Sequence, residues 1–476
     1  MVTAILILIP FLVALACFFS GSNAKKIALS GSVVELGLAL YTFIQFSNEG
    51  GSSFDLNYAW IKDLGINFHI GLDGPGMMMV LLTALLTPII IYSSFSHEHK
   101  SPGSFYGLIL FMQVGLTGVF VAYDAFLFYI FWELALIPIY FIAALWGGKD
   151  RIRITLKFFI YTIAGSLLML VAFIFLYVKS PDHSFSLASL QHANIDRSAQ
   201  GLIFWAFFIA FAVKIPIFPF HTWQPDTYTD APAAGTMMLS GIMLKMGLFG
   251  MIRWMLPLVP LGMEDWGNYA LVLAVGGVLY ASFIALAQTD LKRMIAYVSM
   301  AHVGLIAAGI MVQNPQAYSG AILQMFSHGI TVVGLFFVID VIEKHTGTRL
   351  IEGLGGIAKK NSLFAITFMV ILLGSIALPL TSGFPGEFLI LSGLFQYNAW
   401  LAAFGGLTII LGAYYMLRAY QRVMLGEVSS TTLSFQTLEK NEKIILLVIT
   451  LLVVGVGIYP KIFLDVINNS VLMIAK

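Results

Sequence analysis

Long apolar stretches recur along the whole chain and are separated by short polar joints. A helix that crosses a bilayer needs about 20 predominantly apolar residues, and windows of that length predict fourteen such helices. They lie near residues 2–20, 28–47, 76–96, 104–122, 125–146, 157–178, 200–220, 235–256, 268–287, 293–312, 317–341, 363–395, 400–424 and 443–465. Lipid admits only helices or closed barrels, and the runs lack the strict alternation of barrel strands. We therefore expect an all-α polytopic membrane protein.

The polar joints are too short to hold a separate soluble domain, so we predict one membrane domain over residues 1–476. The longest joints are 48–75, 179–199, 342–362 and 425–442. The expected parts are three N-terminal helices in 1–100, a first repeat in 104–256, a second repeat in 268–424 and a C-terminal helix in 425–476.

Paired prolines in two of the apolar segments indicate an internal repeat. Pro216 and Pro219 lie in FAVKIPIFPFH, and Pro379 and Pro385 lie in SIALPLTSGFPGE. Proline removes a backbone donor and clashes with the preceding turn, so both helices should be broken. Aligning the second prolines gives an offset of 166 residues. Five helices per repeat is an odd number, so the copies would lie inverted in the membrane, as in many transporters. The alternative is two unrelated proline kinks.

Lysine and arginine are distributed unevenly between the two sides of the predicted helices. With the N-terminus outside the cytoplasm, 16 of the 25 fall in cytoplasmic loops, six on the opposite side and three within helices. The positive-inside rule then places both termini on the non-cytoplasmic side. A cleaved signal peptide in 1–24 is the alternative for the first helix. However, no Lys or Arg precedes Lys25, as the positive region of a signal peptide would require.

Composition excludes several kinds of chemistry. Only 10% of residues are charged and 59% are hydrophobic, whereas soluble chains have about 25% charged residues. The single cysteine, Cys17, cannot hold an iron–sulfur cluster, form an internal disulfide or make a zinc site. No Gly-rich phosphate loop opens a helix after a strand. We therefore expect no redox cofactor on this chain.

Four charged residues interrupt the apolar spans and are the first candidates for a proton-handling site. They are Glu133, Lys214, Lys245 and Glu387. A charge at the bilayer centre costs roughly 2.5–3.5 kcal/mol on insertion scales. In a low dielectric, a Glu–Lys pair can act as a switch, because protonating or separating one partner changes the proton affinity of the other. The alternative is a static structural ion pair.

Three histidines lie in or near spans and could extend such a path: His221, His302 and His328. Histidine titrates near neutral pH and can pass protons, although a lone histidine on an apolar face is more often a core residue. The segments of His302 and His328 lie, in sequence order, between the lysines and Glu387, and His221 lies beside the predicted break, which favours a relay.

The remaining charged residues of the spans carry weaker signals. We interpret Glu35 as structural and leave Arg418 open between local pairing and snorkelling to an interface. Asp124, Asp290 and Asp340 fall at predicted helix ends, where solvated or capping roles are expected.

Three long motifs carry a family resemblance. They are FPFHTWQPDTYTDAPAAGTMMLSGIMLKMG at 218–247, FWELALIP at 131–138 and QTDLKRMIAYVSMAHVG at 288–304. The chain resembles, over nearly its whole length, the antiporter-like subunits of proton-pumping NADH:quinone oxidoreductase, respiratory complex I. In that family, charges on the fifth, seventh, eighth and twelfth helices form a hydrated chain along the membrane plane. The matching positions are Glu133, Lys214, Lys245 and Glu387.

Within the family, the glutamate at the twelfth-helix position resembles the M branch. The L and N branches, and the D branch found in multisubunit cation/proton antiporters, usually carry lysine there. The chain also ends soon after the fourteenth predicted helix, without the long lateral arm of the L branch. Thr227 and Tyr228 follow Pro225-Asp226, where the family often has Ala-His, so no proton-uptake role can be carried over to that position.

The resemblance implies a subunit of a proton-translocating oxidoreductase in the bacterial inner membrane that carries no redox site of its own. FMN, iron–sulfur clusters and quinone are expected on partner subunits, and the expected partners are neighbouring membrane subunits and lipid, with no nucleic acid. Two alternatives stay open. One is the D-branch component of a multisubunit sodium/proton antiporter, and the other is a scaffold subunit whose charges only hold the bundle together.

Overall fold

The computed structural model describes residues 1–49, 54–435 and 437–474. The N-terminal part contains helices α1 (Val2–Phe19), α2 (Ala24–Glu49) and α3 (Gly74–Ser93), with strands β1 (Leu56–Ile61) and β2 (Ile66–Ile70) between the last two. The next part contains α4 (Pro102–Val121), α5 (Ala125–Trp146), α6 (Arg151–Lys179), α7 (Leu187–Gln191), α8 (Arg197–Lys214), α9 (Trp223–Asp230), α10 (Ala233–Met238), α11 (Leu244–Gly250) and α12 (Leu256–Leu258). The last part contains α13 (Pro260–Leu286), α14 (Leu291–Met311), α15 (Pro315–Thr346), α16 (Ile357–Lys360), α17 (Ser362–Ser375), α18 (Gly383–Tyr397), α19 (Ala399–Met424), α20 (Lys440–Ile458) and α21 (Lys461–Ile474).

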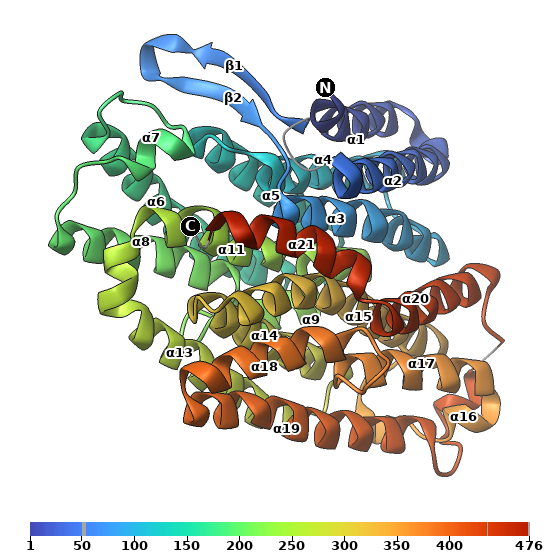
Figure 1. Cartoon of the computed structure of the whole chain (residues 1–476). Helices are drawn as coiled ribbons and strands as arrows, with labels where there is room; N and C mark the ends of the chain where they lie inside the picture. Colours follow the sequence, from blue (N-terminus) through green and yellow to red (C-terminus); the bar gives the residue numbers. More distant parts are fainter. Residues whose placement is uncertain (50–53, 436, 475–476) are drawn as a thin grey trace.

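The helices lie side by side with roughly parallel axes, with α1 and α2 at one edge and α19 at the opposite edge (Figure 1). Among the described residues, 12 helical stretches are long and apolar enough to cross a membrane. Two further spans are each broken into a pair of shorter helices, α8 with α9 and α17 with α18. The predicted all-α fold with fourteen spans, two of them broken, is therefore confirmed.

The predicted repeat is visible in matching loop contacts made by two aspartates 166 residues apart. Asp124 caps the start of α5 by accepting hydrogen bonds from two backbone N–H groups, and Asp290 caps the start of α14 in the same way. Each aspartate also forms an isolated β-bridge to the loop ahead of the next broken helix, Asp124 with Ser186 and Asp290 with Leu350. The two five-helix units therefore share these loop contacts, and their odd helix number predicts that the second one is inverted in the membrane.

The two helix breaks align with each other at a different offset from the one that the prolines predicted. In the first unit, Ile217 N donates to Ala212 O at 2.7 Å, and in the second, Leu378 N donates to Leu373 O at 3.1 Å. The offset between these bonds is 161 residues, so the alignment of Pro219 with Pro385 at 166 is wrong. Pro219 lies in the break, whereas Pro385 lies in the first turn of α18, where a missing N–H leaves no helical bond unmade.

Three spans form the enclosed centre of the bundle. The most apolar windows of the eighth span (Ala233–Leu258) and of α14 are 100% buried, and that of α15 is 94% buried. The corresponding windows of α1 and α19 are only 28% buried. The eighth span is continuous but contains two π-helical turns, Leu239–Met243 and Met251–Met255. The centre therefore contains the segments that carry Lys245, His302 and His328.

Two parts of the fold differ from the sequence-based expectations. The joint 48–75 contains the antiparallel hairpin of β1 and β2, because Leu56–Ile61 and Ile66–Ile70 flank a turn with Gly65 in the left-handed region, φ 59°. The helix expected over 443–465 instead ends at Ile458, before Tyr459-Pro460, and α21 follows it. The part 425–476 therefore holds two long helices rather than one. Phe463 of α21 packs against Phe43 and Phe326.

Close packing of helices through glycine gives a testable consequence. A Cβ added at Gly115 of α4 would lie 2.5 Å from Ala135 N and 2.8 Å from Ala135 Cα of α5. The two backbones must then separate, so we expect Gly115→Ala to destabilise the chain by about 1–3 kcal/mol. The measurement is the thermal unfolding midpoint of the purified membrane complex. Gly37→Ala is the matched control, because nothing lies within 4 Å of its Cβ position. Equal midpoints for both variants would contradict the tight α4–α5 contact.

Candidate functional site

Lys245 lies at the centre of the bundle and contacts a histidine from another helix. Its Nζ atom donates to Ser240 O at 2.8 Å and lies 2.9 Å from His328 Nδ1 of α15. Glycines bring the two helices together, since a Cβ at Gly241 would lie 2.6 Å from Val333 and one at Gly329 would lie 3.0 Å from Gly241 O. The lysine is fully buried.

A second contact continues from His328 towards the twelfth span. The rings of His328 and His302 have centroids 5.8 Å apart. His302 Nδ1 of α14 lies 2.9 Å from Glu387 Oε1 of α18, and Gln324 Nε2 of α15 donates to the same oxygen at 2.9 Å. Glu387 is only 1% exposed. We call Lys245, His328, His302, Gln324 and Glu387 the central array.

Lys214 and Glu133 lie outside the central array and do not bond each other directly. Lys214 is the last residue of α8 and is buried, and its Nζ atom lies 5.3 Å from the ring centroid of Trp132. Glu133 of α5 is near enough to act on it electrostatically. Neither Lys214 Nζ nor Glu133 Oε1 has a hydrogen-bond partner among the described residues. The end of α8 packs on α11, where a Cβ at Gly247 would lie 2.6 Å from the Ile215 side chain.

His221 is separate from the central array. It lies in the break between α8 and α9, is 4% exposed, and packs against the rings of Phe218 and Tyr280. Its Nδ1 atom has no hydrogen-bond partner among the described residues. Of the seven predicted site residues, the structure thus joins four, places Glu133 and Lys214 near each other, and leaves His221 apart.

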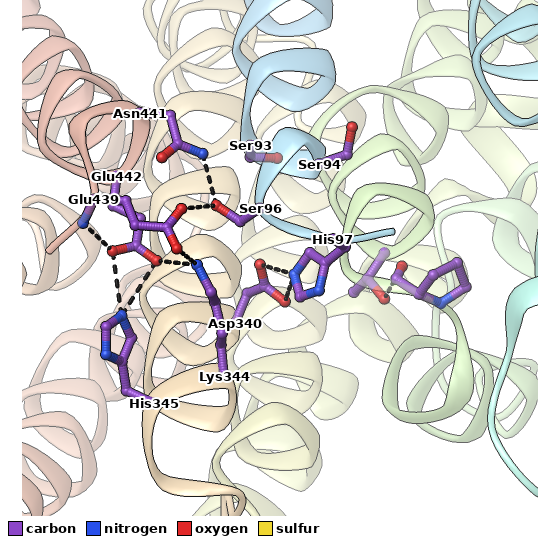
Figure 2. A network of polar contacts seen from close by, with 12 residues as sticks. Ser93, Ser94, Ser96, His97, Asp340, Lys344, His345, Glu439, Asn441 and Glu442 are labelled. Carbon is purple, nitrogen blue, oxygen red and sulfur yellow. Dashed lines mark hydrogen bonds and ion pairs between the residues drawn. The ribbon is translucent and has the colours of Figure 1, made fainter. Parts of the chain in front are cut away.

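A cluster of ion pairs lies at the predicted cytoplasmic end of the spans (Figure 2). His97, in the loop between α3 and α4, bonds Asp340 of α15 at 2.9 Å. Lys344 of α15 pairs with Glu439 at 2.5 Å and Glu442 at 3.0 Å, next to the start of α20. His345 pairs with Glu442 at 3.2 Å. We call these residues the cytoplasmic-end cluster, and it ties together three segments far apart in sequence.

Sequence reasoning missed Gln324, the cytoplasmic-end cluster and a buried pair at the opposite end. In that pair, Arg253 is 4% exposed, donates to Asp73 at 2.6 Å and lies 4.0 Å from the ring centroid of Tyr123. Gln324 could have been found, because it precedes His328 by four residues and so lies on the same helix face. Asp340, expected to be solvated or capping, instead pairs with His97 from within α15.

The structure also places the residues that carried weaker signals in the sequence. Glu35 of α2 is 1% exposed, and its Oε2 atom has no hydrogen-bond partner among the described residues. Arg418 of α19 donates to Tyr414 OH at 3.4 Å on the exposed face of that helix. Tyr228 is fully buried. Among the described residues, no group of three or more His, Cys, Asp or Glu side chains could hold a metal ion.

Comparison with known proteins decides the family. Residues 122–412 match the family described as NADH:quinone oxidoreductase/Mrp antiporter, TM. The chain is 40% identical over 478 residues to NADH-quinone oxidoreductase subunit M of Rickettsia prowazekii, covering 99% of this chain and 97% of that protein. The chain belongs to this family.

Two further members extend the comparison. The F(420)H(2) dehydrogenase subunit M of Methanosarcina mazei is 38% identical, with 98% of this chain and 97% of that protein covered. A chain of respiratory complex I from Thermus thermophilus with bound NADH superimposes with a TM-score of 0.93 at 29% identity, covering 100% of this chain and 99% of that chain. The resemblance to the M branch seen in the sequence is therefore confirmed.

The His97–Asp340 contact gives a pH-dependent expectation. The hydrogen bond with Asp340 raises the pKa of His97, although burial and Lys344 act in the opposite direction. The stabilisation is therefore fully present below the ordinary histidine pKa of about 6.5 and is lost as the pH rises through the raised value. We expect Asp340→Asn to cost about 0.2–1 kcal/mol at low pH, given that the His97 side chain is 36% exposed. At alkaline pH, the cost should be smaller.

The measurement is the thermal unfolding midpoint of the purified complex on both sides of the His97 titration. Asp63→Asn is the control, because Asp63 is an exposed residue of the hairpin turn. A loss in Asp340→Asn that is the same at both pH values would contradict a charged His97–Asp340 pair.

Proposed function

We propose that this chain translocates protons as an antiporter-like subunit of a membrane oxidoreductase complex, with electron transfer to quinone on other subunits as the driving reaction. The observation that carries this proposal is the central array, in which contacts of 2.9 Å join Lys245 to His328 and His302 to Glu387. Lys245, His302 and His328 lie on the three most enclosed spans of the bundle. Ionisable groups inside a membrane are costly and are expected to serve a path.

The array has the geometry that a proton relay needs. A neutral imidazole accepts a proton at one nitrogen and donates from the other. His328 uses Nδ1 towards Lys245, and its Nε2 atom has no partner among the described residues. His302 uses Nδ1 towards Glu387. One ordered water or hydroxyl suffices to bridge the two rings.

Glu133 and Lys214 form the other end of the proposed path. Because they interact electrostatically without a direct bond, a proton arriving at Glu133 would weaken the attraction that holds the charge on Lys214. That change would favour release of a proton from Lys214 towards Lys245 on the adjoining helix. His221 lies in the break between α8 and α9. In the proposed path, its only place is at the side next to α9.

The remaining features of the proposal follow from the relatives. NADH-linked and F(420)H(2)-linked subunits M are almost equally similar to this chain, which supports an electron donor site on another subunit. We accordingly place FMN, iron–sulfur clusters and quinone on partner subunits and no redox cofactor here. The proposed location is the bacterial inner membrane, with both termini on the non-cytoplasmic side and with neighbouring antiporter-like subunits as partners.

The central expectation is that charge removal stops transport without stopping assembly. Glu133→Gln and Lys214→Ala should each greatly reduce proton uptake by inverted vesicles that oxidise NADH, while the complex still assembles. The controls are Glu352→Gln and Lys360→Ala, because both residues are exposed and lie outside the membrane spans. Normal NADH-driven uptake in the charge variants would defeat the proposal.

The same vesicles separate the alternatives. A scaffold subunit predicts that the charge variants fail to assemble and that any assembled complex pumps normally. A sodium/proton antiporter subunit predicts sodium-dependent proton exchange in the absence of NADH oxidation.

A further inference from the structure

The two oxygens of Glu387 have different surroundings. His302 Nδ1 and Gln324 Nε2 both lie 2.9 Å from Oε1. The Oε2 atom is buried and has no hydrogen-bond partner among the described residues. Gln324 donates to Oε1, and His302 also donates to it in the tautomer that carries its hydrogen on Nδ1. Donors on one oxygen stabilise negative charge there and make it the carbonyl-like one when the group is protonated. The proton of the carboxyl is then expected on Oε2.

Close packing of α15 against α18 fixes Gln324 in this position. A Cβ at Gly386 would lie only 2.6 Å from Gln324 Oε1 and 3.0 Å from Gln324 Cα. One turn earlier on α15, a Cβ at Gly320 would lie 2.9 Å from Gly386 O. The glycines therefore bring the two backbones close enough for the amide to direct its NH₂ group at the carboxylate next to Gly386.

A second polar group lies near the same carboxyl. Tyr415 of α19 is 3% exposed and interacts electrostatically with Glu387. Its hydroxyl is close enough to Ser282 of α13 to interact with it, and a phenol hydroxyl can both accept and donate a hydrogen bond. The unpartnered Oε2 of Glu387 is the acidic atom available for proton exchange.

We infer that Gln324 is a positioning residue that confines the exchangeable proton of Glu387 to Oε2. Oε1 then faces His302, and Oε2 exchanges its proton on the side of Tyr415. The inference rests on the proposed function. In a transfer step, the Oε2–H bond breaks as a new O–H bond forms on a water or hydroxyl oxygen, and the negative charge left on the carboxylate is stabilised at Oε1 by His302 and Gln324. Without Gln324, both oxygens compete for the proton, and the two sides of the relay are no longer distinct.

The test is Gln324→Met, which keeps the side-chain volume and removes the donor. Gln113→Met is the matched control, because Gln113 is a fully buried glutamine of α4 whose amide atoms have no partner among the described residues. Proton uptake per NADH oxidised is measured in inverted vesicles of the whole complex. We expect a loss of about tenfold for Gln324→Met, the equivalent of one hydrogen bond to a charged group, and no loss for the control.

Infrared difference spectroscopy of the same complex distinguishes positioning from packing. The carboxyl band of Glu387 is identified by its absence in Glu387→Gln across a pH titration. Loss of one donor on Oε1 should move this band to higher wavenumber in Gln324→Met and leave it in place in Gln113→Met. If Gln324→Met does not assemble, Gln324→Asn, which withdraws the amide by one carbon, should show the same shift.

The outcomes separate the two proposals. Normal transport in Glu387→Gln would overturn the role of Glu387 in the proposed function. Impaired transport in Glu387→Gln, combined with an unmoved band and normal transport in Gln324→Met, would overturn the positioning role alone. A carboxyl band of Glu387 that is missing at every pH would also overturn it, since the inference requires a protonated form.

Discussion

The structure depends on one constraint, which is that an ionisable group inside the bilayer must find its partner within the protein. The centre of this bundle is enclosed by other helices, and an unpaired charge there is expensive. At the central array the chain meets the constraint by bringing five polar side chains from four helical segments to one place. Lys214 and Glu133 instead interact only electrostatically. Glycines at the helix contacts make this convergence possible, because side chains there would hold the backbones apart.

The backbone departs from regular helix close to these ionisable groups. The break between α8 and α9 and the break between α17 and α18 lie next to Lys214 and Glu387, and a π-helical turn precedes Lys245. Irregular backbone at membrane depth is tolerated where protein surrounds it. Here, the π-helical turn contains the carbonyl of Ser240 that accepts a hydrogen bond from Lys245. The irregular segments therefore contribute to the polar site as well as shaping it.

Much of this arrangement was predictable from the sequence, because the strongest signals are periodic or costly. Apolar length located the spans, proline located the broken helices, and Glu133, Lys214, Lys245 and Glu387 were conspicuous as charges among apolar residues. Gln324 was overlooked, since an uncharged amide in an apolar run carries little signal without its partner. The cytoplasmic-end cluster could not be predicted, because His97 and Asp340 are 243 residues apart and only tertiary packing brings them together. The predicted alignment of the two breaks was wrong for a related reason. The two Phe-Pro pairs have the same residue types but occupy different backbone positions in the two breaks.

Helix α15 links the two polar regions mechanically. It runs without interruption for 32 residues, a length of about 48 Å. It carries Gln324 and His328 of the central array, and Asp340 and Lys344 at the predicted cytoplasmic end. A displacement of the helix as a whole would move both sets of side chains together. The contact between His328 and Lys245 is 2.9 Å long, and a displacement of about 1 Å is enough to break a hydrogen bond. A force applied to α15 where it emerges from the membrane would therefore open or close the middle of the polar array without any change of charge there.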